Sequence, residues 1–568
     1  MTACKIGGHI LYDSTKQRSN DMNHITYNDF LDKIHGCWYG KCLGGAAGAP
    51  AEGLKKLVET EDFTEIFNPD LPNDDLDIQL LWLEVLEQKG LSITSEDLAD
   101  AWLAKCWYPF SEYGYFLKNY ERGVKPPYSG IINNSFFKEG MGCAIRSEIW
   151  GLISAGNPEL AVTYAYNDAC LDHADNAIYA EQFLAAAESM AFFETDMCTL
   201  LSGALTYIPA DCKLAKCFAE VMNCYRAGTD WSLARKKVLD RYSHPDFTNI
   251  IQNMGFVLIA LLYGEGDMRA TINIALKCGY DTDCTCASAA ALLGIMTGYK
   301  ALGDEIGGLI QDYFVCGIDV KRPSDSVYGL ALDTAAIALS VENDCISVTD
   351  VPEELAWIRR VRPQIVNIYP TQEGYNEALA KLQPVCWQMY GPYFEQMEQP
   401  IDPHYPSPHS EGCSLPDVVC MVNNQVFLDK AYIDEGTLAM PEADYMGLAR
   451  AYEDLIPIEQ IAGMEGQMCV YLKTTVVSPK KQKMWMLIGN TDGFKVWVNK
   501  KEVLAKDEIR TYTPYNNFCL PEFEAGENEV VIKLLRRTDH VQFALGLRRF
   551  FEGVHWHRSK WHTDLEYK

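Results

Sequence analysis

Apolar residues recur three or four positions apart through most of residues 29–345. In DIQLLWLEVLEQKG (77–90), Ile78, Leu81 and Val85 fall on one helical face, and neighbouring leucines widen that face. Alanine-rich stretches with the same spacing follow further along the chain. The pattern predicts an all-α, bundle-like domain over residues 29–345, preceded by an N-terminal segment, 1–28, and excludes an alternating βαβ chain.

The pattern changes after residue 345. Prolines become frequent, which predicts a linker with some helical structure over residues 346–384. From residue 385 to 568, β-branched and aromatic residues alternate with polar ones between turn signals, as expected for a β-sandwich. The stretch TDGFKVWVNKKEVL (491–504) resembles the strand–turn–strand of jelly-roll modules attached to carbohydrate-active enzymes.

Composition and charge indicate which partners the protein can bind and in which cellular compartment it is expected. The net charge of −29 disfavours nucleic acid, and no apolar run reaches the roughly 20 residues needed to cross a bilayer. The 20 cysteines are scattered, and the N-terminal stretch MTACKIGGHI lacks the apolar core of a signal peptide. We therefore expect a cytoplasmic protein without nucleic-acid or membrane partners.

Carboxylates stand at three expected helix ends within the helical domain. Asp281 and Asp283 precede an alanine-rich helix, NDD at 73–75 opens another, and Glu52 follows the glycine-rich stretch 36–53. Each alone fits an ordinary helix cap, because Asp is favoured in the first turn of a helix. Three such ends in one domain favour a cation site, since hard cations take oxygen ligands from several segments.

These residues carry a resemblance to the ADP-ribosylglycohydrolase family, including its dinitrogenase-reductase-activating type. The glycine-rich helix ending in Glu52, the NDD segment and the DTDC segment at 281–284 resemble the family's motifs in order and spacing. EGMGCAIRSEIWGL and CLDHADNAIYAEQFLAAA resemble the segments that would place Arg146 and His173 beside the site.

The resemblance implies an all-α fold that uses one or two Mg²⁺ or Mn²⁺ ions, with Ca²⁺ as a further candidate, to cleave a glycosidic bond to ADP-ribose or a related sugar. It implies these metal ligands: Asn73, Asp74, Asp75, Asp281 and Asp283. Glu52, Asp75 and Asp283 are the residues expected to act in catalysis, where a carboxylate takes the proton of the attacking water.

Three positions depart from the family pattern. Asn73 and Leu76 replace hydroxyl residues, and Cys284 replaces the last threonine of the late motif. A thiol is a poor ligand for Mg²⁺, so the second metal position is expected to be altered or absent. A glycosidase for another O- or N-glycoside, and a catalytically inactive, crystallin-like protein, therefore stay open as alternatives.

Other candidates have a functional and a structural interpretation. Glu139 is either a general acid or a solvated charge, and Arg146 either anchors substrate or pairs with the acidic cluster. His173 fits a substrate contact or an inter-helix hydrogen bond, and Trp107 and Tyr108 a sugar-stacking platform or core packing. The expected partner is a small-molecule or glycan substrate, and homo-oligomerisation stays open.

Overall fold

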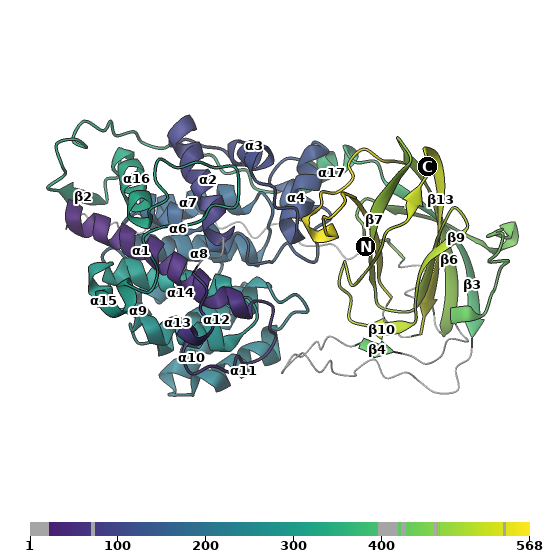
Figure 1. Ribbon diagram of the computed structural model, residues 1–568, viewed down its shortest axis with the longest axis horizontal. Helices are drawn as coiled ribbons and strands as arrows, with labels where there is room; N and C mark the ends of the chain where they lie inside the picture. The colour runs from purple at the N-terminus through teal and green to yellow at the C-terminus, as the bar shows by residue number, and fades with distance from the viewer. Residues whose placement is uncertain are drawn as a thin grey trace.

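The computed structural model describes residues 22–69, 74–395, 419–421, 428–458, 461, 464, 466–537 and 541–568. A helical part and a strand-rich part lie side by side along the longest axis of the molecule (Figure 1). The predicted order, an all-α domain followed by a β-sandwich, is confirmed.

The helices begin and end as follows: α1 (Tyr27–Gly48), α2 (Asp74–Lys89), α3 (Ser95–Lys105), α4 (Ser111–Glu121), α5 (Tyr128–Ile131), α6 (Glu148–Ile153), α7 (Pro158–Ala169), α8 (Asn176–Met190), α9 (Met197–Ala204), α10 (Lys213–Arg226), α11 (Trp231–Tyr242), α12 (Ile250–Tyr263), α13 (Met268–Cys278), α14 (Thr282–Thr297), α15 (Gly303–Gly307), α16 (Val327–Ser340) and α17 (Gln372–Ala380). Two strands flank α1 to α16, β1 (Asn23–Thr26) and β2 (Ile346–Thr349), and they pair in parallel.

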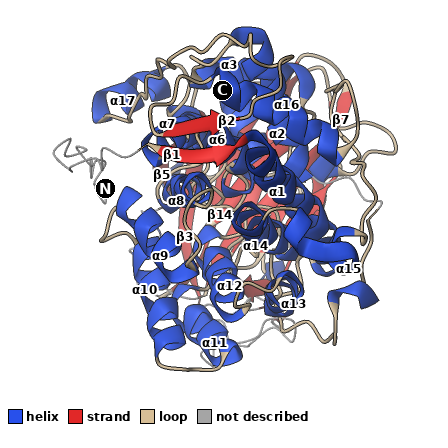
Figure 2. Ribbon diagram, turned by 90° about the vertical axis from the view of Figure 1, so that its left-hand side faces the viewer, coloured by secondary structure: helices blue, strands red, loops and turns tan. Residues whose placement is uncertain are grey.

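Helices α1 and α14 run side by side through the middle of the helical domain (Figure 2). Four glycines of α1, at positions 36, 40, 44 and 48, face α14 one turn apart. A Cβ atom on Gly44 would lie 2.4 Å from the carbonyl oxygen of Cys286, and one on Gly48 would lie 2.1 Å from that of Thr282. Only glycine permits this approach, so the two helix backbones are locked together.

The second part contains these strands: β3 (Val385–Glu395), β4 (Val419–Met421), β5 (Tyr445–Ala451), β6 (Gln467–Ser478), β7 (Gln482–Asn490), β8 (Phe494–Val498), β9 (Lys501–Lys506), β10 (Glu508–Arg510), β11 (Asn517–Cys519), β12 (Glu522–Phe523), β13 (Gly526–Arg536), β14 (Phe543–Arg549) and β15 (Glu566–Tyr567). The larger sheet has the order β5-β3-β6-β13-β8-β9, with β15 beside β6. In the smaller sheet, β7 pairs with β11, β12 and β14. Apolar side chains from both sheets, including Met486 and Ile532, form the core.

The two domains are joined by an aromatic cluster and by polar contacts. Tyr115 and Phe137 of the helical domain pack against Leu487 and Trp561 of the sandwich. The Lys118 ammonium lies 2.5 Å from a carboxylate oxygen of Asp454. The Asp454 backbone N–H also donates to Asn133 Oδ1 over 2.8 Å. Buried aromatic contact and a largely buried ion pair together fix the sandwich against α4.

Over the described ranges, no helix has both the length and the apolar character needed to span a bilayer. Cysteines whose side chains the structure describes carry free thiols.

Candidate functional site

The close contact between α1 and α14 brings three carboxylates together. Thr282 Oγ1 donates to the Gly48 carbonyl over 2.7 Å, which ties the start of α14 to the end of α1. Residues just beyond these ends pair as well, because the Tyr280 N–H donates to the Leu54 carbonyl over 2.8 Å. One ligand atom from each of Glu52, Asp281 and Asp283 lies within 4.8 Å of the other two.

Helix α2 adds a second group of ligand atoms, which shares Asp283 with the first. Oxygens of Asp75 and Asp283 and the sulfur of Cys284 lie within 4.8 Å of one another. The Cys284 thiol donates to Asp75 Oδ1 over 3.5 Å. We call Glu52, Asp75, Asp281, Asp283 and Cys284 the acidic cluster.

The acidic cluster fits a divalent ion. Its oxygens come from three separate segments, which is the donor set that Mg²⁺ and Mn²⁺ prefer. Asp283 Oδ1 is buried without a hydrogen-bond partner among the described residues. Because a buried polar atom without a partner is costly, this oxygen is suited to a cation ligand.

Burial and mutual repulsion shift the pKa values of these carboxyls upward. Loss of hydration, then Asp74 and Asp75, raise the pKa of Glu52 to about 7. Burial and the neighbouring Glu52 raise the pKa of Asp283 to about 6. Burial and Asp283 hold the pKa of Asp281 well above its usual range. The cluster therefore exchanges protons near neutral pH when no cation offsets its charge.

A buried lysine lies against one side of the acidic cluster. Lys41 Nζ is 3.6 Å from Asp75 Oδ2 and 2.9 Å from Glu148 Oε1, and all three side chains are fully buried. Gln79 donates to the second Glu148 oxygen over 2.8 Å. Neither Lys41 nor Glu148 was predicted from the sequence. The sequence did hold one signal, a lysine within the small-residue stretch GCWYGKCLGG. A helix of such residues packs closely against its neighbours, so the charge of this lysine requires a carboxylate partner in the interior.

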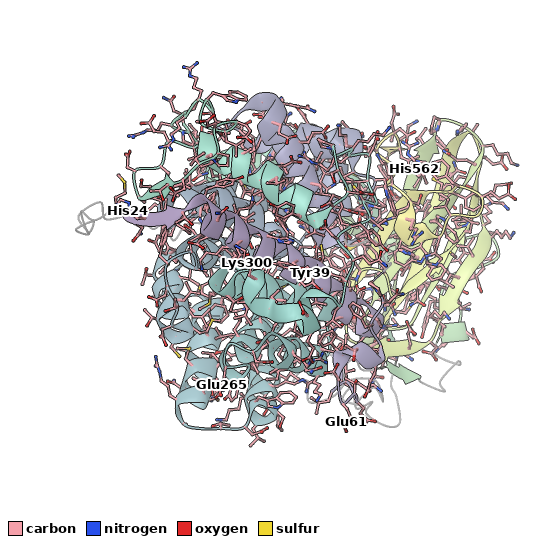
Figure 3. The ribbon with its side chains drawn as sticks, turned by 60° about the vertical axis from the view of Figure 1, so that its left-hand side comes forward. His24, Tyr39, Glu61, Glu265, Lys300 and His562 are labelled. Carbon is pink, nitrogen blue, oxygen red and sulfur yellow. The ribbon has the colours of Figure 1, made fainter. Side chains whose placement is uncertain are left out.

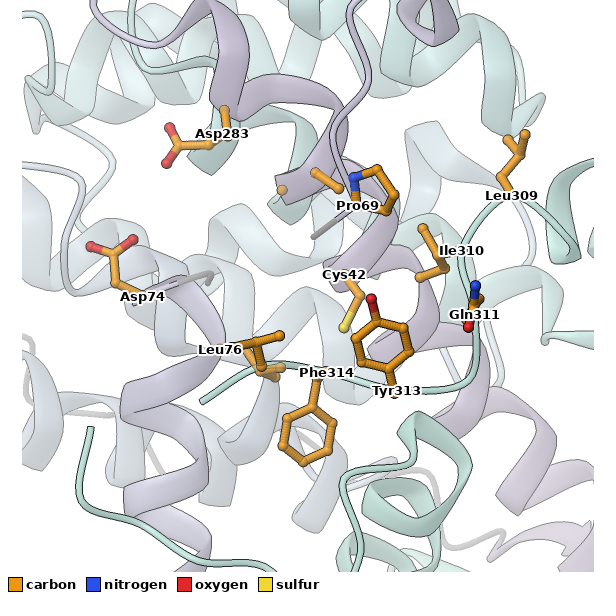
Figure 4. A pocket seen from close by; sticks show the side chains of 14 residues that line it. Cys42, Pro69, Asp74, Leu76, Asp283, Leu309, Ile310, Gln311, Tyr313 and Phe314 are labelled. Carbon is orange, nitrogen blue, oxygen red and sulfur yellow. The ribbon is translucent and has the colours of Figure 1, made fainter. Parts of the chain in front are cut away.

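A cavity of about 140 Å³ opens beside Asp74 and Asp283. Figure 4 shows the carboxylates of these two residues on one side and the rings of Tyr313 and Phe314 on the other. The segment that carries these rings is held by α1, because the Ile310 N–H donates to the hydroxyl of Tyr39 over 3.3 Å. Figure 3 labels Tyr39 on α1. The cavity therefore combines an acidic side with an apolar, aromatic side.

Arg146 and His173 lie in an ion-pair network in the interior. The Arg146 guanidinium is fully buried and contacts Asp168 Oδ1 and Asp172 Oδ1, each over 2.7 Å. His173 Nδ1 is 2.7 Å from Asp172 Oδ1, and its Nε2 is 3.4 Å from Glu112 Oε1. Arg146 therefore pairs with Asp168 and Asp172 rather than with the acidic cluster, and His173 lies between Asp172 and Glu112.

The remaining predicted residues lie in three other settings. Glu139 Oε1 accepts from the Asn176 side chain over 2.6 Å, and Tyr108 donates its hydroxyl to Asp77. Trp107 is 41 % exposed and donates its ring N–H to the Gly317 carbonyl over 2.9 Å. Asn73 lies outside the described residues.

Glu112 and Asp246 were missed at the sequence level. Both side chains are buried, and burial together with Glu112 raises the pKa of Asp246 to about 7. They lie on α4 and in the loop before α12, in stretches without any recognisable motif. The sequence offered no signal that these two carboxyls approach each other.

Comparison with known proteins matches one family model. The model described as ADP-ribosylglycohydrolase matches residues 26–342. Among solved structures, an "ADP-ribosylglycohydrolase-related protein complex" is 21% identical, with a TM-score of 0.35, over 55% of this chain and 97% of that chain.

Two further solved structures are similar to the chain. A "PA14 sugar-binding domain from RTX adhesin" is 12% identical over 32% of this chain and 99% of that chain, with a TM-score of 0.16. A β-glucosidase from Kluyveromyces marxianus, in complex with glucose, is 9% identical over 48% of this chain and 33% of that chain, with a TM-score of 0.18. No curated protein matches the chain.

Proposed function

Because the chain belongs to the ADP-ribosylglycohydrolase family, we propose that it is a metal-dependent glycoside hydrolase that cleaves a bond to ADP-ribose or a related sugar. One observation carries the proposal: carboxylates from the ends of α1, α2 and α14 converge within 4.8 Å in two groups that share Asp283. Convergence from three segments is what a cation site requires and what three independent helix caps do not explain.

The residues of the acidic cluster have different proposed roles. Glu52, Asp281 and Asp283 would hold the cation, with Asp75 beside it and Asp74 at the rim of the adjoining cavity. A bound Mg²⁺ or Mn²⁺ would orient sugar hydroxyls and would act as a Lewis acid that activates the attacking water.

Glu52 is the candidate general base. In the metal-free protein, loss of hydration and the neighbouring carboxylates raise its pKa to about 7. A bound cation would lower this pKa, so a Glu52 oxygen that the cation does not engage would accept a proton from the attacking water. Glu52 lies on the exposed side of the cluster, where water can reach it. The rings of Tyr313 and Phe314 would restrict water on the opposite side of the cavity.

A second candidate function is hydrolysis of a neutral glycoside. The cavity of about 140 Å³ is lined by Asp74, Asp283, small residues and aromatic or aliphatic side chains, and the described lining contains neither Lys nor Arg. A pyrophosphate placed there would meet two carboxylates without a side-chain cation to offset its charge. A neutral sugar with an apolar aglycone fits this lining better.

The test combines cation binding with a substrate panel. Metal-free full-length protein is titrated calorimetrically with Mg²⁺, Mn²⁺ and Ca²⁺, and hydrolysis of ADP-ribosyl substrates is compared with that of neutral aryl glycosides. We expect saturable binding and hydrolysis that chelator removes and Mg²⁺ or Mn²⁺ restores.

Variants separate the acidic cluster from ordinary helix caps. Asp281→Asn is expected to lower hydrolysis by about 100-fold or more, because it removes a cluster oxygen. The control is Asp230→Asn, because Asp230 caps the start of α11 at the exposed surface. Unchanged hydrolysis in Asp281→Asn would contradict the proposal, and cation binding without hydrolysis of any substrate would favour an inactive protein.

The cytoplasmic location and the partners expected from the sequence stay predictions.

A further inference from the structure

The ammonium of Lys41 is a cation that lies beside Asp75, one residue of the acidic cluster. Its ammonium donates to the Ile145 carbonyl over 2.6 Å and lies 2.9 Å from Glu148 Oε1 and 3.6 Å from Asp75 Oδ2. The side chain is fully buried, and burial of a charge is tolerated only when opposite charge and hydrogen bonds offset it. The protein therefore carries a permanent positive charge next to Asp75.

The helix packing prevents Lys41 from moving away. Lys41 lies between Gly40 and Gly44, whose Cα atoms face Ala290 and Cys286 of α14 at distances that leave no room for a side chain. A Cβ on Gly40 would lie 2.3 Å from the Ala290 carbonyl oxygen. The backbone of Lys41 is thus held by the same contact that brings the acidic cluster together.

The two groups of ligand atoms differ in what they offer a metal ion. Glu52, Asp281 and Asp283 form a group of three carboxylates. The second group consists of Asp75, Asp283 and Cys284, so one of its three donors is a sulfur atom, and Asp75 already faces Lys41. Hard cations disfavour a thiol ligand, and a second divalent ion there would be repelled by a fixed ammonium.

We propose that the site holds a single divalent ion, bound by Glu52, Asp281 and Asp283, and that the Lys41 ammonium takes the place of a second ion beside Asp75. This assignment rests on the proposed function, since it requires that the acidic cluster binds a metal. Lys41 acts through Asp75 and is a positioning residue. Its ammonium holds the Asp75 carboxylate in place beside the bound ion without drawing a second metal into the site.

The number and surroundings of bound Mn²⁺ ions test the assignment in the full-length chain. Calorimetric titration of metal-free protein should give one equivalent per chain, and electron paramagnetic resonance should show the spectrum of an isolated ion. Lys41→Gln retains an amide donor toward Glu148 and removes the charge. We expect this variant to take up a second Mn²⁺ at least about tenfold more tightly than the unchanged protein, with a spectrum of two coupled ions.

Two controls separate the charge of Lys41 from other effects. Lys533 in the sandwich is also fully buried and bonds to the Leu428 and Lys430 carbonyls and to Glu435, so Lys533→Gln should leave one equivalent. Cys284→Ser replaces the soft donor by an oxygen and retains Lys41, and it should also bind one equivalent.

The outcomes distinguish this assignment from the proposed function. Two equivalents in the unchanged protein, or in Cys284→Ser, would overturn the role of Lys41 and leave metal-dependent hydrolysis intact. Absence of Mn²⁺ binding in the unchanged protein would overturn both. If Lys41→Gln does not fold, the stoichiometry and spectrum of the unchanged protein and of Cys284→Ser still decide.

Discussion

Each domain gathers a group of acidic side chains, and the two groups are held in place by different forces. In the sandwich, Arg537 Nε lies 2.7 Å from Asp492 Oδ1, and Arg537 Nη1 lies 2.6 Å from Asp507 Oδ1. The Arg537 backbone N–H also donates to Asp492 Oδ2 over 2.6 Å. These carboxylates are held by the charge of the arginine that they surround.

In the helical domain, the backbone holds the carboxylates together despite their repulsion. Asp281 and Asp283 lie at the start of α14, and Glu52 lies just beyond the end of α1, where glycine contacts fix the two helices. Burial and then Glu52 raise the pKa of Asp283 to about 6, whereas at Asp492 the Arg537 guanidinium opposes the upward shift that burial produces. The comparison teaches that a buried aspartate has a structural role where a neighbouring arginine neutralises its charge. Where backbone packing alone fixes its position, the aspartate is available to bind a ligand.

Arg537→Met should produce the largest effect on stability. It leaves Asp492 and Asp507 buried without the guanidinium, so the free energy of unfolding is expected to fall by about 3–5 kcal/mol. Urea unfolding followed by fluorescence measures the loss. Lys481→Met, at a surface pair with Glu522, is the control and should leave the free energy of unfolding nearly unchanged, because solvent screens an exposed ion pair. An equal loss of unfolding free energy in the two variants would show that Arg537 does not hold the sandwich carboxylates in place.

Gly44→Ala tests whether packing holds the acidic cluster. The new Cβ would lie 2.4 Å from the Cys286 carbonyl oxygen, so α1 and α14 must separate at a cost of about 1–3 kcal/mol. Mn²⁺ affinity should fall with stability because the carboxylates move apart. Gly307→Ala, where the nearest atom is 3.4 Å away, should change neither quantity. Full Mn²⁺ affinity in Gly44→Ala would show that packing does not position the cluster.

Asp283→Asn should stabilise the metal-free protein. The folded-state pKa of about 6 exceeds the ordinary value, so the folded protein holds this proton more tightly, and above about pH 7 the ionised carboxylate opposes folding. Removing its charge is expected to add about 1–2 kcal/mol to the free energy of unfolding at about pH 8. Asp492→Asn should lower stability, because it removes a partner of Arg537. A loss of stability in both variants would contradict the comparison.

Replacement of His173 should produce the smallest effect, a change in how the free energy of unfolding depends on pH. Burial opposes its charge, but Asp172 and Cys143 hold its pKa well above the ordinary value. Its stabilising contribution is therefore complete below about pH 6.5, the unfolded value, and is lost as pH rises toward the folded pKa, by about 1 kcal/mol per pH unit.

His173→Gln should flatten this part of the stability profile relative to the unchanged protein, as measured by urea unfolding at a series of pH values. His24→Gln, at an exposed position of β1, is the control and should retain the slope. An unchanged slope in His173→Gln would mean that His173 is not charged in the folded protein.

The sequence predicted the parts of the fold that depend on local pattern. Ile78, Leu81 and Val85 are buried in α2 as their helical spacing predicts, although nearly all of this helix is buried, and the stretch 494–498 is β8. Asp281 and Asp75 stand at helix starts, as expected from their position ahead of apolar runs. Such features are set by neighbouring residues and can be inferred without knowledge of tertiary contacts.

Contacts between distant segments could not be predicted in the same way. The approach of Lys41 to Asp75 and Glu148 depends on how α1, α2 and α6 pack. The same holds for Glu112 and Asp246, whose surrounding sequence carries no motif. Pairing of β1 with β2 joins segments more than 300 residues apart, and local pattern holds no information on such a pair.

The aromatic contact between the domains has a consequence for synthesis of the chain. Tyr115 and Phe137 are covered by Leu487 and Trp561, which leave the ribosome much later. At about 5–20 residues per second, the interval between Phe137 and Trp561 lasts about 20–85 s. In the later part of that interval, once the helical domain is complete, it presents an uncovered aromatic surface, so the newly made chain has a window for chaperone capture or aggregation that closes when the sandwich docks.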